Sequence, residues 1–281
     1  MNSVLYKIAE KNNIRIKLVD NLYGGDINKA YLIRSEKKDY VVKVNSAHLY
    51  PNMFETEARG LNLLSSANSF RIPEVIFVGK IESHSYILME FIESGSETEA
   101  IWDDFADCLV SLHKNSQANF GLDHSNYIGK LPQYNSEEKT ASEFYIQQRL
   151  EPQFKMAHDK GYEFKDLGRF YSIISEEIPN EAPSLIHGDL WNGNYLVSDL
   201  GEPSLIDPAV AFAPREMDLA MMQLFGGFSS TVYSKYNERF PLIEQWGERI
   251  KLWQLYYLLV HLNLFGSGYF NQVHSIVKQY L

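Results

Sequence analysis

The sequence is poor in features that define whole classes of protein. Its 281 residues include a single cysteine, Cys108, so no internal disulfide can form, as expected in a reducing cytoplasm. The longest apolar runs, such as "LYYLLV", are far shorter than the ~20 residues of a membrane helix. The N-terminus has no basic stretch followed by an apolar core, which argues against a signal peptide. We therefore expect a soluble, cytoplasmic protein without a membrane partner.

Positive charge is also scarce. Lys and Arg number 26 against 36 Asp and Glu, a formal net charge of −10, and no run of basic residues could form a face for nucleic acid. The chain contains no H-E-x-x-H, paired C-x-x-C, G-x-S-x-G or G-x-G-x-x-G motif. These absences argue against a nucleic-acid binder, a zinc site, a hydrolase elbow and a dinucleotide fingerprint. If this acidic protein handles nucleotides, local side chains or a metal must supply the cations.

Apolar residues, in contrast, make up 45% of the chain, enough for a substantial core. The first ninety residues mostly alternate apolar and polar side chains, as strands do, and one helical pattern interrupts them. The predicted strands are 13–19, 30–34, 40–45, 73–81 and 85–92, and the predicted helix is 52–67. We interpret residues 1–92 as a small antiparallel-sheet lobe with one main helix.

The polar segment "ESGSETEA", 93–100, has no apolar period and is interpreted as a linker between lobes. Helical patterns follow over 101–116, near Ser142, around Leu167 and onward to the C-terminus. Residues 120–136 are predicted as a loop, and the segments around 184–197 and 203–212 as a short strand pair. The expected fold is α+β and bilobal, with residues 93–281 forming a larger, mostly helical lobe and a cleft between the two.

The densest polar cluster is "SLIHGDLWNGNYLV", 184–197, which places costly polar groups among apolar strand residues. A loop leaving a strand can project Asp189 forward, while Asn194 turns back towards Asp207 on the next strand. Two oxygen ligands together with a polyphosphate suit Mg²⁺, which leaves Asp189 to accept a proton from an attacking hydroxyl. The sequence therefore predicts a phosphoryl-transfer site.

The same order, an Asp, an Asn five residues later and then a second Asp, is found in the protein-kinase catalytic loop and metal-binding Asp. A single such Asp is more often a residue that caps a local turn. For the whole ordered set, "HGDLWNGN" followed by "LID", the catalytic interpretation is favoured. His187 is interpreted as a hydrogen-bonding residue that steadies the loop.

A matching lysine lies in the N-terminal half. Lys43 sits within the apolar strand "VVKVN", and a lone strand lysine is most often a solvated edge residue. The helix that follows, however, places Glu57 on its apolar face, where a carboxylate needs a cation. A Lys43–Glu57 pair would hold the ammonium in reach of nucleotide phosphates.

Two further stretches complete the predicted nucleotide site. In "LYGGDINKAY" Gly24, Gly25 and Asp26 form a turn whose backbone could approach a phosphate, although a Gly-Gly turn alone is more often a hairpin. In "LMEFIE" the backbone of Glu90, Phe91 and Ile92 could hydrogen-bond an adenine. Both stretches are candidates by their position relative to Lys43.

These motifs together resemble the fructosamine kinase (ketosamine-3-kinase) family, within the protein-kinase-like and aminoglycoside phosphotransferase-like superfamily. The resemblance runs nearly end to end. The motifs that carry it are "GGDINKAY", "FETEARGL", "FGLDHSNYIGKLPQYN", "HGDLWNGN" and "DPAVAFAPREMDLAMMQLFGGF", in that order. "HGDLW" with "REMDLAMMQLFGGF" is more specific than "HGD", which aminoglycoside phosphotransferases and choline kinases share.

The resemblance implies an ATP- and Mg²⁺-dependent kinase that phosphorylates the sugar 3-hydroxyl of ketoamines, free or on glycated protein, as a deglycation repair activity. It implies Asp189 as the base, Asn194 and Asp207 as metal ligands, and Lys43 with Glu57 as the phosphate-positioning pair. Trp191 and Asp218 are candidate substrate residues. Trp191 is equally well explained as part of the lobe core.

Two alternatives remain open from the sequence. The first is a kinase of the same fold acting on another hydroxyl compound, such as an aminoglycoside or an amino alcohol. The second is a nucleotide-binding module without catalysis, against which the intact set of polar residues argues. The chain also departs from its relatives at Ala211, Ala213 and Pro214, a stretch expected to border the acceptor.

Overall fold

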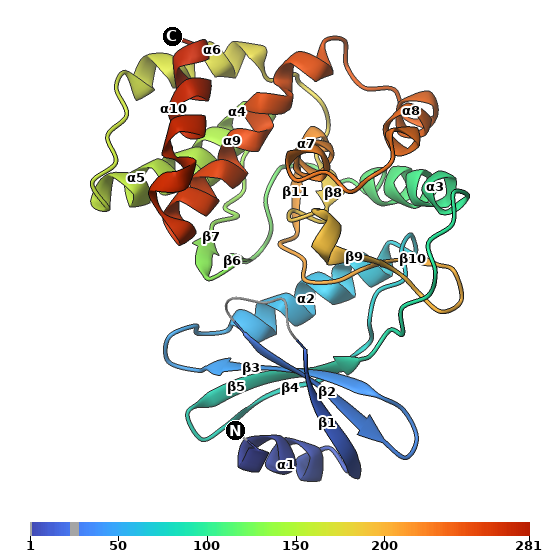
Figure 1. The fold of residues 1–281 in the computed structure, drawn as a ribbon. Coiled ribbons are helices and arrows are strands. Elements are labelled where there is room, and N and C mark those ends of the chain that lie inside the picture. The colour runs from blue at the N-terminus through green and yellow to red at the C-terminus, as the bar shows by residue number, and fades with distance from the viewer. Residues whose placement is uncertain (1, 23–27) are drawn as a thin grey trace.

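In the computed structural model the described residues are 2–22 and 28–281. They form a sheet-bearing N-terminal lobe and a mostly helical C-terminal lobe (Figure 1), which confirms the predicted fold class. The N-terminal lobe contains α1 (Asn2–Lys11), β1 (Ile16–Leu22), β2 (Lys29–Ser35), β3 (Tyr40–Ser46), α2 (Met53–Ser66), β4 (Val75–Ile81) and β5 (His84–Glu90).

The N-terminal sheet has the strand order β1-β2-β3-β5-β4, and all neighbouring strands are antiparallel. Successive side chains of a strand point to opposite faces, so β3 sends Val42 and Val44 to one face and Lys43 to the other. Val42 and Val44 pack in a core with α1, whereas Lys43 faces α2 and the C-terminal lobe. The strand period therefore aims the lysine at the space between the lobes.

Helix α1 is an addition to the predicted lobe, for which the sequence indicates one main helix. It buries Val4, Leu5 and Ile8 against the outer face of the sheet. This cover explains why strands of the lobe are buried on both faces.

Helix α2 follows the predicted pattern. Its residues Phe54, Ala58, Leu61 and Leu64 are buried in a single core cluster. Glu57 lies among them with only 11% of its side chain exposed. The predicted carboxylate on an apolar helix face is confirmed.

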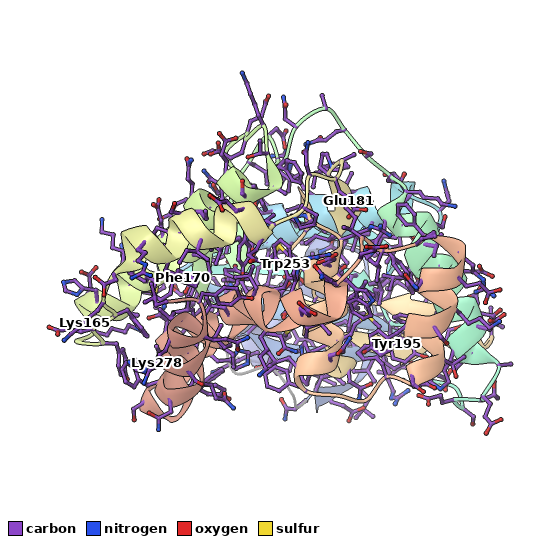
Figure 2. The ribbon with its side chains drawn as sticks, turned by 90° about the horizontal axis from the view of Figure 1, so that it is seen from above. Lys165, Phe170, Glu181, Tyr195, Trp253 and Lys278 are labelled. Carbon is purple, nitrogen blue, oxygen red and sulfur yellow. The ribbon has the colours of Figure 1, made fainter. Side chains whose placement is uncertain are left out.

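The C-terminal lobe is built around the 20-residue helix α9, with Trp253 in the middle of the lobe and Lys165 and Lys278 at its edge (Figure 2). Its helices are α3 (Ile101–His113), α4 (Ala141–Glu143), a π-helical turn (Phe144–Leu150), α5 (Glu151–Asp159), α6 (Leu167–Glu177), α7 (Glu216–Leu224), α8 (Ser230–Arg239), α9 (Trp246–Phe265) and α10 (Phe270–Gln279). Two short 3-10 turns span Asn192–Asn194 and Ser267–Tyr269.

Six strands of three residues each lie between these helices: β6 (Asn126–Ile128), β7 (Leu131–Gln133), β8 (Ser184–Ile186), β9 (Tyr195–Val197), β10 (Pro203–Leu205) and β11 (Ala211–Ala213). The predicted loop 120–136 thus contains a β6–β7 hairpin. The predicted single strand pair is two antiparallel ribbons, β8 with β11 and β9 with β10. Strands this short carry no readable period, so sequence could not resolve them.

Candidate functional site

A cavity of about 450 Å³ lies between the lobes. Its lining includes six of the predicted site residues: Lys43, Glu57, Asp189, Trp191, Asn194 and Asp207. They come from β3 and α2 of one lobe and from the loops after β8 and β10 of the other. Residues more than 160 positions apart are therefore neighbours here, and we call this space the interlobe cavity.

Lys43 is the cation of this cavity. Its Nζ donates to Glu57 Oε1 at 2.7 Å and to Asp207 Oδ1 in the opposite lobe. Burial by itself lowers the pKa of Lys43, but the Asp207 and Glu57 carboxylates outweigh it and hold that pKa above its ordinary value. The lysine is therefore a charged ammonium, and it links the two lobes.

Asp207 reaches the lysine through an unusual backbone conformation. Its φ of 55° lies in the left-handed region, which non-glycine residues rarely occupy. The flanking chain holds it there, because Ile206 N donates to Asn194 O at 3.0 Å and Ala209 N donates to His187 O at 2.9 Å. Such strain is typical of functional positions.

The 3-10 turn Asn192–Asn194 folds Asn194 back onto Asp189. Its Nδ2 donates to the Asp189 backbone oxygen at 2.8 Å and to Asp189 Oδ2 at 3.2 Å, and it lies 3.4 Å from Asp207 O. The three residues whose spacing suggested a common site are thus brought together. Burial, with a smaller contribution from the Asp207 carboxylate, raises the pKa of Asp189 to about 7, although the Asn194 hydrogen bond opposes this.

His187 supports this loop from behind. Its Nε2 is 2.9 Å from Ile206 O, a carbonyl that can only accept, so Nε2 carries the proton. Its Nδ1 is then free to accept from Asp189 N at 3.3 Å. Burial lowers the pKa of His187, which keeps the ring neutral in this tautomer.

Asp218 lies elsewhere than predicted. It does not line the interlobe cavity and is fully buried on α7, where it accepts from His187 N at 2.7 Å and Gly188 N at 2.9 Å. Gly188, at φ 82°, has no room for a Cβ, which would lie 2.0 Å from Ala209 O. Asp218 therefore holds the loop that bears Asp189 in place. Its burial away from the cavity corrects the sequence interpretation, which placed it among the residues of an open cleft.

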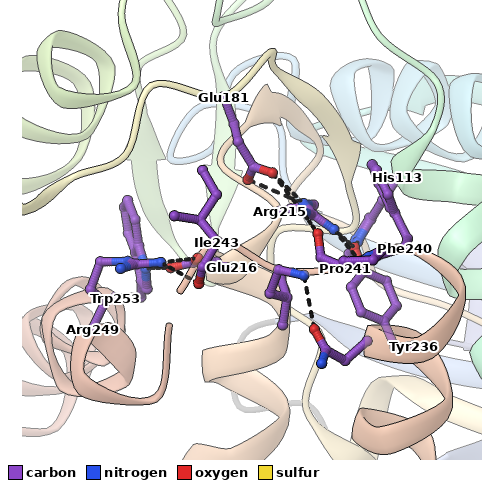
Figure 3. A network of polar contacts seen from close by, with 12 residues as sticks. His113, Glu181, Arg215, Glu216, Tyr236, Phe240, Pro241, Ile243, Arg249 and Trp253 are labelled. Atoms are coloured by element: carbon purple, nitrogen blue, oxygen red, sulfur yellow. Dashed lines mark hydrogen bonds and ion pairs between the residues drawn. The ribbon is translucent and has the colours of Figure 1, made fainter. Parts of the chain in front are cut away.

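The neighbouring motif residues are also scaffold (Figure 3). Arg249 donates two hydrogen bonds to Glu216, at 2.6 and 2.9 Å, and Trp253 Nε1 adds a third at 2.7 Å. Arg215 pairs with Glu181 and donates to the Phe240 backbone at 2.8 Å. The Arg-Glu pair of "REMDLA" thus ties α7 to α9 and to the loop after α8.

The departure at Ala211 and Ala213 falls in the same scaffold. Both side chains are fully buried on β11, opposite Ile186 and Ser184 of β8. Neither lines the interlobe cavity, so these two side chains would not touch an acceptor bound there. Pro208 and Ala209, immediately before it, do line the cavity.

The predicted adenine segment lies apart from the interlobe cavity. Glu90, Phe91 and Ile92 line a second hollow of about 380 Å³, shared with the β2–β3 turn 35–39. Glu90 N already donates to Glu74 O at 2.9 Å and Phe91 N to Asp39 O at 3.3 Å. Within residues 2–22 and 28–281, the Ile92 N–H has no protein acceptor. Gly24, Gly25 and Asp26 lie outside the described residues.

Sequence reasoning missed one wall of the cavity. Tyr127 and Gly129 come from the unpredicted β6–β7 hairpin, and Tyr127 Oη reaches the other lobe at Pro51 O, 3.0 Å away. Phe225, His261 and Phe265 come from the ends of α7 and α9. The Gly between "NYI" and "KLP" could have predicted the hairpin, and the Gly-Gly after Phe225 could have predicted a turn there. Nothing in the sequence marked the two α9 residues.

The chemistry of the oxygen donors fits a small divalent cation. Asn194 uses its Nδ2 towards Asp189, which leaves its Oδ1 as the group able to accept a ligand bond. The Asp207 side chain is 45% exposed to the cavity. The described residues hold no cluster of three or more His, Cys, Asp or Glu suited to a metal, so a cation here would need oxygens from a substrate.

Comparisons with known proteins show which family the chain resembles. The family model described as fructosamine kinase matches residues 2–281. A probable ketoamine kinase of Enterococcus faecium is 37% identical, over 92% of this chain and 93% of the relative. The chloroplastic protein-ribulosamine 3-kinase of Arabidopsis thaliana is 32% identical, over 98% of this chain and 86% of the relative.

Solved structures show the same fold. A candidate fructosamine-3-kinase from Haemophilus somnus superposes with a TM-score of 0.90 at 29% identity, over 99% of this chain and 96% of the other. An aminoglycoside phosphotransferase, 17% identical over 97% of each chain, gives a TM-score of 0.68, a likeness of fold alone. Of the helices described, none is long and apolar enough to cross a membrane. The family model and these relatives span nearly the whole length, and the chain belongs to the fructosamine kinase family.

Proposed function

We propose that this protein is an ATP-dependent kinase that phosphorylates the 3-hydroxyl of the sugar in ketoamines, the adducts of reducing sugars with amines. The single observation that carries the proposal is Lys43. Its ammonium pairs with Glu57 in its own lobe and with Asp207 in the other, inside the cavity that also holds Asp189. Family membership supports the choice of acceptor.

Lys43 is proposed to bind the ATP phosphates. A buried ammonium held by Glu57 has a fixed position and a full charge, as phosphate binding requires. The contact with Asp207 is replaceable, because that side chain is 45% exposed and can turn from the lysine towards a cation.

Asn194 and Asp207 are proposed to hold Mg²⁺, through Asn194 Oδ1 and the Asp207 carboxylate. When bound, the ion supplies positive charge to the phosphate oxygens. Among the described residues that line the interlobe cavity, Lys43 is the one basic side chain of the ion-pair cluster and faces two carboxylates, Glu57 and Asp207, so this cluster carries a negative charge that favours a divalent cation.

Asp189 is proposed as the base. The oxygen of the sugar hydroxyl forms a bond to the γ-phosphorus of ATP, the bond from that phosphorus to the bridging oxygen of ADP breaks, and the hydroxyl proton passes to Asp189. A carboxyl pKa raised to about 7 by burial suits this task, because such a group is a stronger base than an ordinary carboxylate. The Asn194 hydrogen bond and the loop held by Asp218 orient it.

For the remaining contacts to the nucleotide, we propose fewer residues than the sequence suggested. Of the adenine segment only Ile92 keeps a backbone N–H without a protein acceptor among the described residues. Ile92 lines the second hollow and not the interlobe cavity, so it is proposed as the donor to an adenine that extends beyond the interlobe cavity. Trp191 lines the cavity two residues after Asp189 and is proposed to pack on the sugar.

The boundary between the two lobes is proposed to lie between Ile92 and Glu93. A cytoplasmic location is also proposed, and the single cysteine supports it.

A panel of acceptors tests the function. We expect Mg²⁺-dependent ADP formation with fructosamines and ribulosamines, and none with aminoglycosides or amino alcohols. Turnover of an aminoglycoside without turnover of any ketoamine would assign the chain to the other activity of this fold. Binding of ATP without turnover of any acceptor would identify a non-catalytic module.

A further inference from the structure

One side of the interlobe cavity is an aromatic strip that the phosphoryl-transfer chemistry does not use. Trp191, Phe225, His261 and Phe265 line it, and their rings follow one another in contact. The ring centroids are 6.5 Å apart from Trp191 to Phe225, 5.0 Å from Phe225 to His261 and 5.4 Å from His261 to Phe265. The strip therefore leads away from the base-bearing loop, one ring at a time.

The strip also leads towards solvent. The exposed fractions are 38% for Trp191, 45% for Phe225 and 55% for Phe265. Large aromatic side chains gathered in one exposed place mark a binding surface rather than ordinary surface variation. An apolar partner is therefore expected at the outer end.

The strip is held in place by its backbone. A Cβ at Gly193 would lie 2.2 Å from the Trp191 ring, and one at Gly227 would lie 2.6 Å from Asn192. Only glycines allow the indole to lie over its own turn and the segment after Phe225 to pack beside it. Gly193 of "NGN" and Gly227 of "FGGF" therefore both leave room for the packing around Trp191.

Among the described residues that line the cavity, none with a formal charge belongs to the outer part of the strip. The acidic lining residues, Glu57, Asp189 and Asp207, belong to the cluster around Lys43. His261 Nδ1 is 2.8 Å from Tyr257 O, so that nitrogen is the protonated one, and burial lowers the pKa of the ring. A group bound at this end is thus selected by apolar contact and not by ion pairing.

We propose that Phe225 and Phe265 form the subsite for the amine substituent of the ketoamine, and that it favours apolar and aromatic substituents. This inference rests on the proposed function. A ketoamine has two ends, a polyhydroxylated sugar and the substituent on its nitrogen. With the reacting hydroxyl at Asp189, the sugar fills the polar end of the cavity. The substituent then lies along the aromatic strip, the part of the same cavity that continues towards solvent.

The test compares two fructosamines that differ only in the substituent, those of methylamine and of benzylamine. We expect kcat/KM of the wild type to be about 10-fold higher for the benzylamine adduct, as for a small apolar group in a hydrophobic site. In Phe265→Ala, and separately in Phe225→Ala, this ratio should fall to about 2-fold or less, with KM for ATP unchanged. Both rings are half-exposed, so each variant should fold.

Phe77→Ala is the matched control. Phe77 is 39% exposed on β4, stacked on Tyr86 and outside the cavity lining, so its removal should leave the ratio of the two adducts unchanged. A wild type that is active on both adducts without preference, or a ratio that survives both substitutions, overturns the subsite and leaves the proposed function standing. A wild type that phosphorylates neither adduct overturns both.

Discussion

Two groups of three carboxylates in this protein have opposite surroundings. In the interlobe cavity Glu57 and Asp207 share one cation, Lys43, and Asp189 accepts a side-chain hydrogen bond from Asn194 but forms no ion pair among the described residues. The Asp207 side chain is 45% exposed. Around α7, in what we call the α7 cluster, Glu181, Glu216 and Asp218 receive Arg215, Arg249, Trp253 and two backbone amides. Carboxylates whose hydrogen bonds and ion pairs are all made within the protein belong to the scaffold. Carboxylates that are incompletely paired beside a cavity indicate a ligand-binding site.

The first way to test this contrast is Asp189→Asn. We expect turnover of a fructosamine to fall by ~10²–10⁴-fold, the contribution of a positioned general base, because the amide cannot accept the hydroxyl proton. ATP binding should be largely kept. Steady-state kinetics with calorimetry of nucleotide binding checks both, and a variant near the wild-type rate would show that Asp189 is not the base.

The second is Glu216→Ala in the α7 cluster. It leaves the buried Arg249 guanidinium without its carboxylate, so we expect the free energy of unfolding to drop by about 3–5 kcal/mol. Urea denaturation measures this. Glu238→Ala is the control, since Glu238 is 68% exposed in its pair with Lys235 and its loss should cost less than about 1 kcal/mol. Equal costs for the two would remove the distinction between scaffold and surface.

The third is Asp207→Ala, on the incompletely paired side. We expect Mg²⁺-dependent ATP binding to weaken by about 10–100-fold, the effect of losing a charged hydrogen-bonding or ligand group. Calorimetry with and without Mg²⁺ measures it, with Asp189→Asn as the comparison that should retain binding. Unchanged affinity would exclude Asp207 from the cation site.

The smallest expected effect is a change in pH dependence at His187. Burial lowers the pKa of His187 in the folded chain, so the unfolded chain binds a proton more readily on acidification. The stability that neutral His187 contributes is present above the ordinary pKa of 6.5 and is lost as the pH falls below it. We expect His187→Gln to show a shallower loss of stability between neutral and acid pH in urea titrations; an identical slope would contradict this.

The sequence predicted the site well wherever a polar residue interrupted the apolar pattern of a strand or helix. Lys43 interrupts an apolar strand and Glu57 interrupts an apolar helix face, and both are buried together at 2.7 Å. The order of Asp189, Asn194 and Asp207 predicted their meeting, which the 3-10 turn and the left-handed Asp207 bring about. In each case the local pattern already showed a polar or charged residue among apolar ones, and such a residue needs a partner in the folded chain.

Prediction failed where the type of a residue was the only clue to its neighbours in the folded chain. Asp218 is the same residue type as Asp207 and lies in a motif of the same region, yet it points into the scaffold. Helix α1 was missed, and β6 and β7 are too short for a period. Phe225 and Phe265 look like any apolar helix residues until the ends of α7 and α9 meet beside Trp191.

The sequence by itself indicated the family, through the resemblance of its motifs. It also predicted the bilobal fold class and which polar residues interrupt an apolar face, because strand and helix periods fix the face that each residue occupies. Only the tertiary structure decided which carboxylates remain incompletely paired and which aromatic rings stay exposed around one cavity. Pairing and exposure depend on neighbours that are distant in sequence, and no local pattern encodes them.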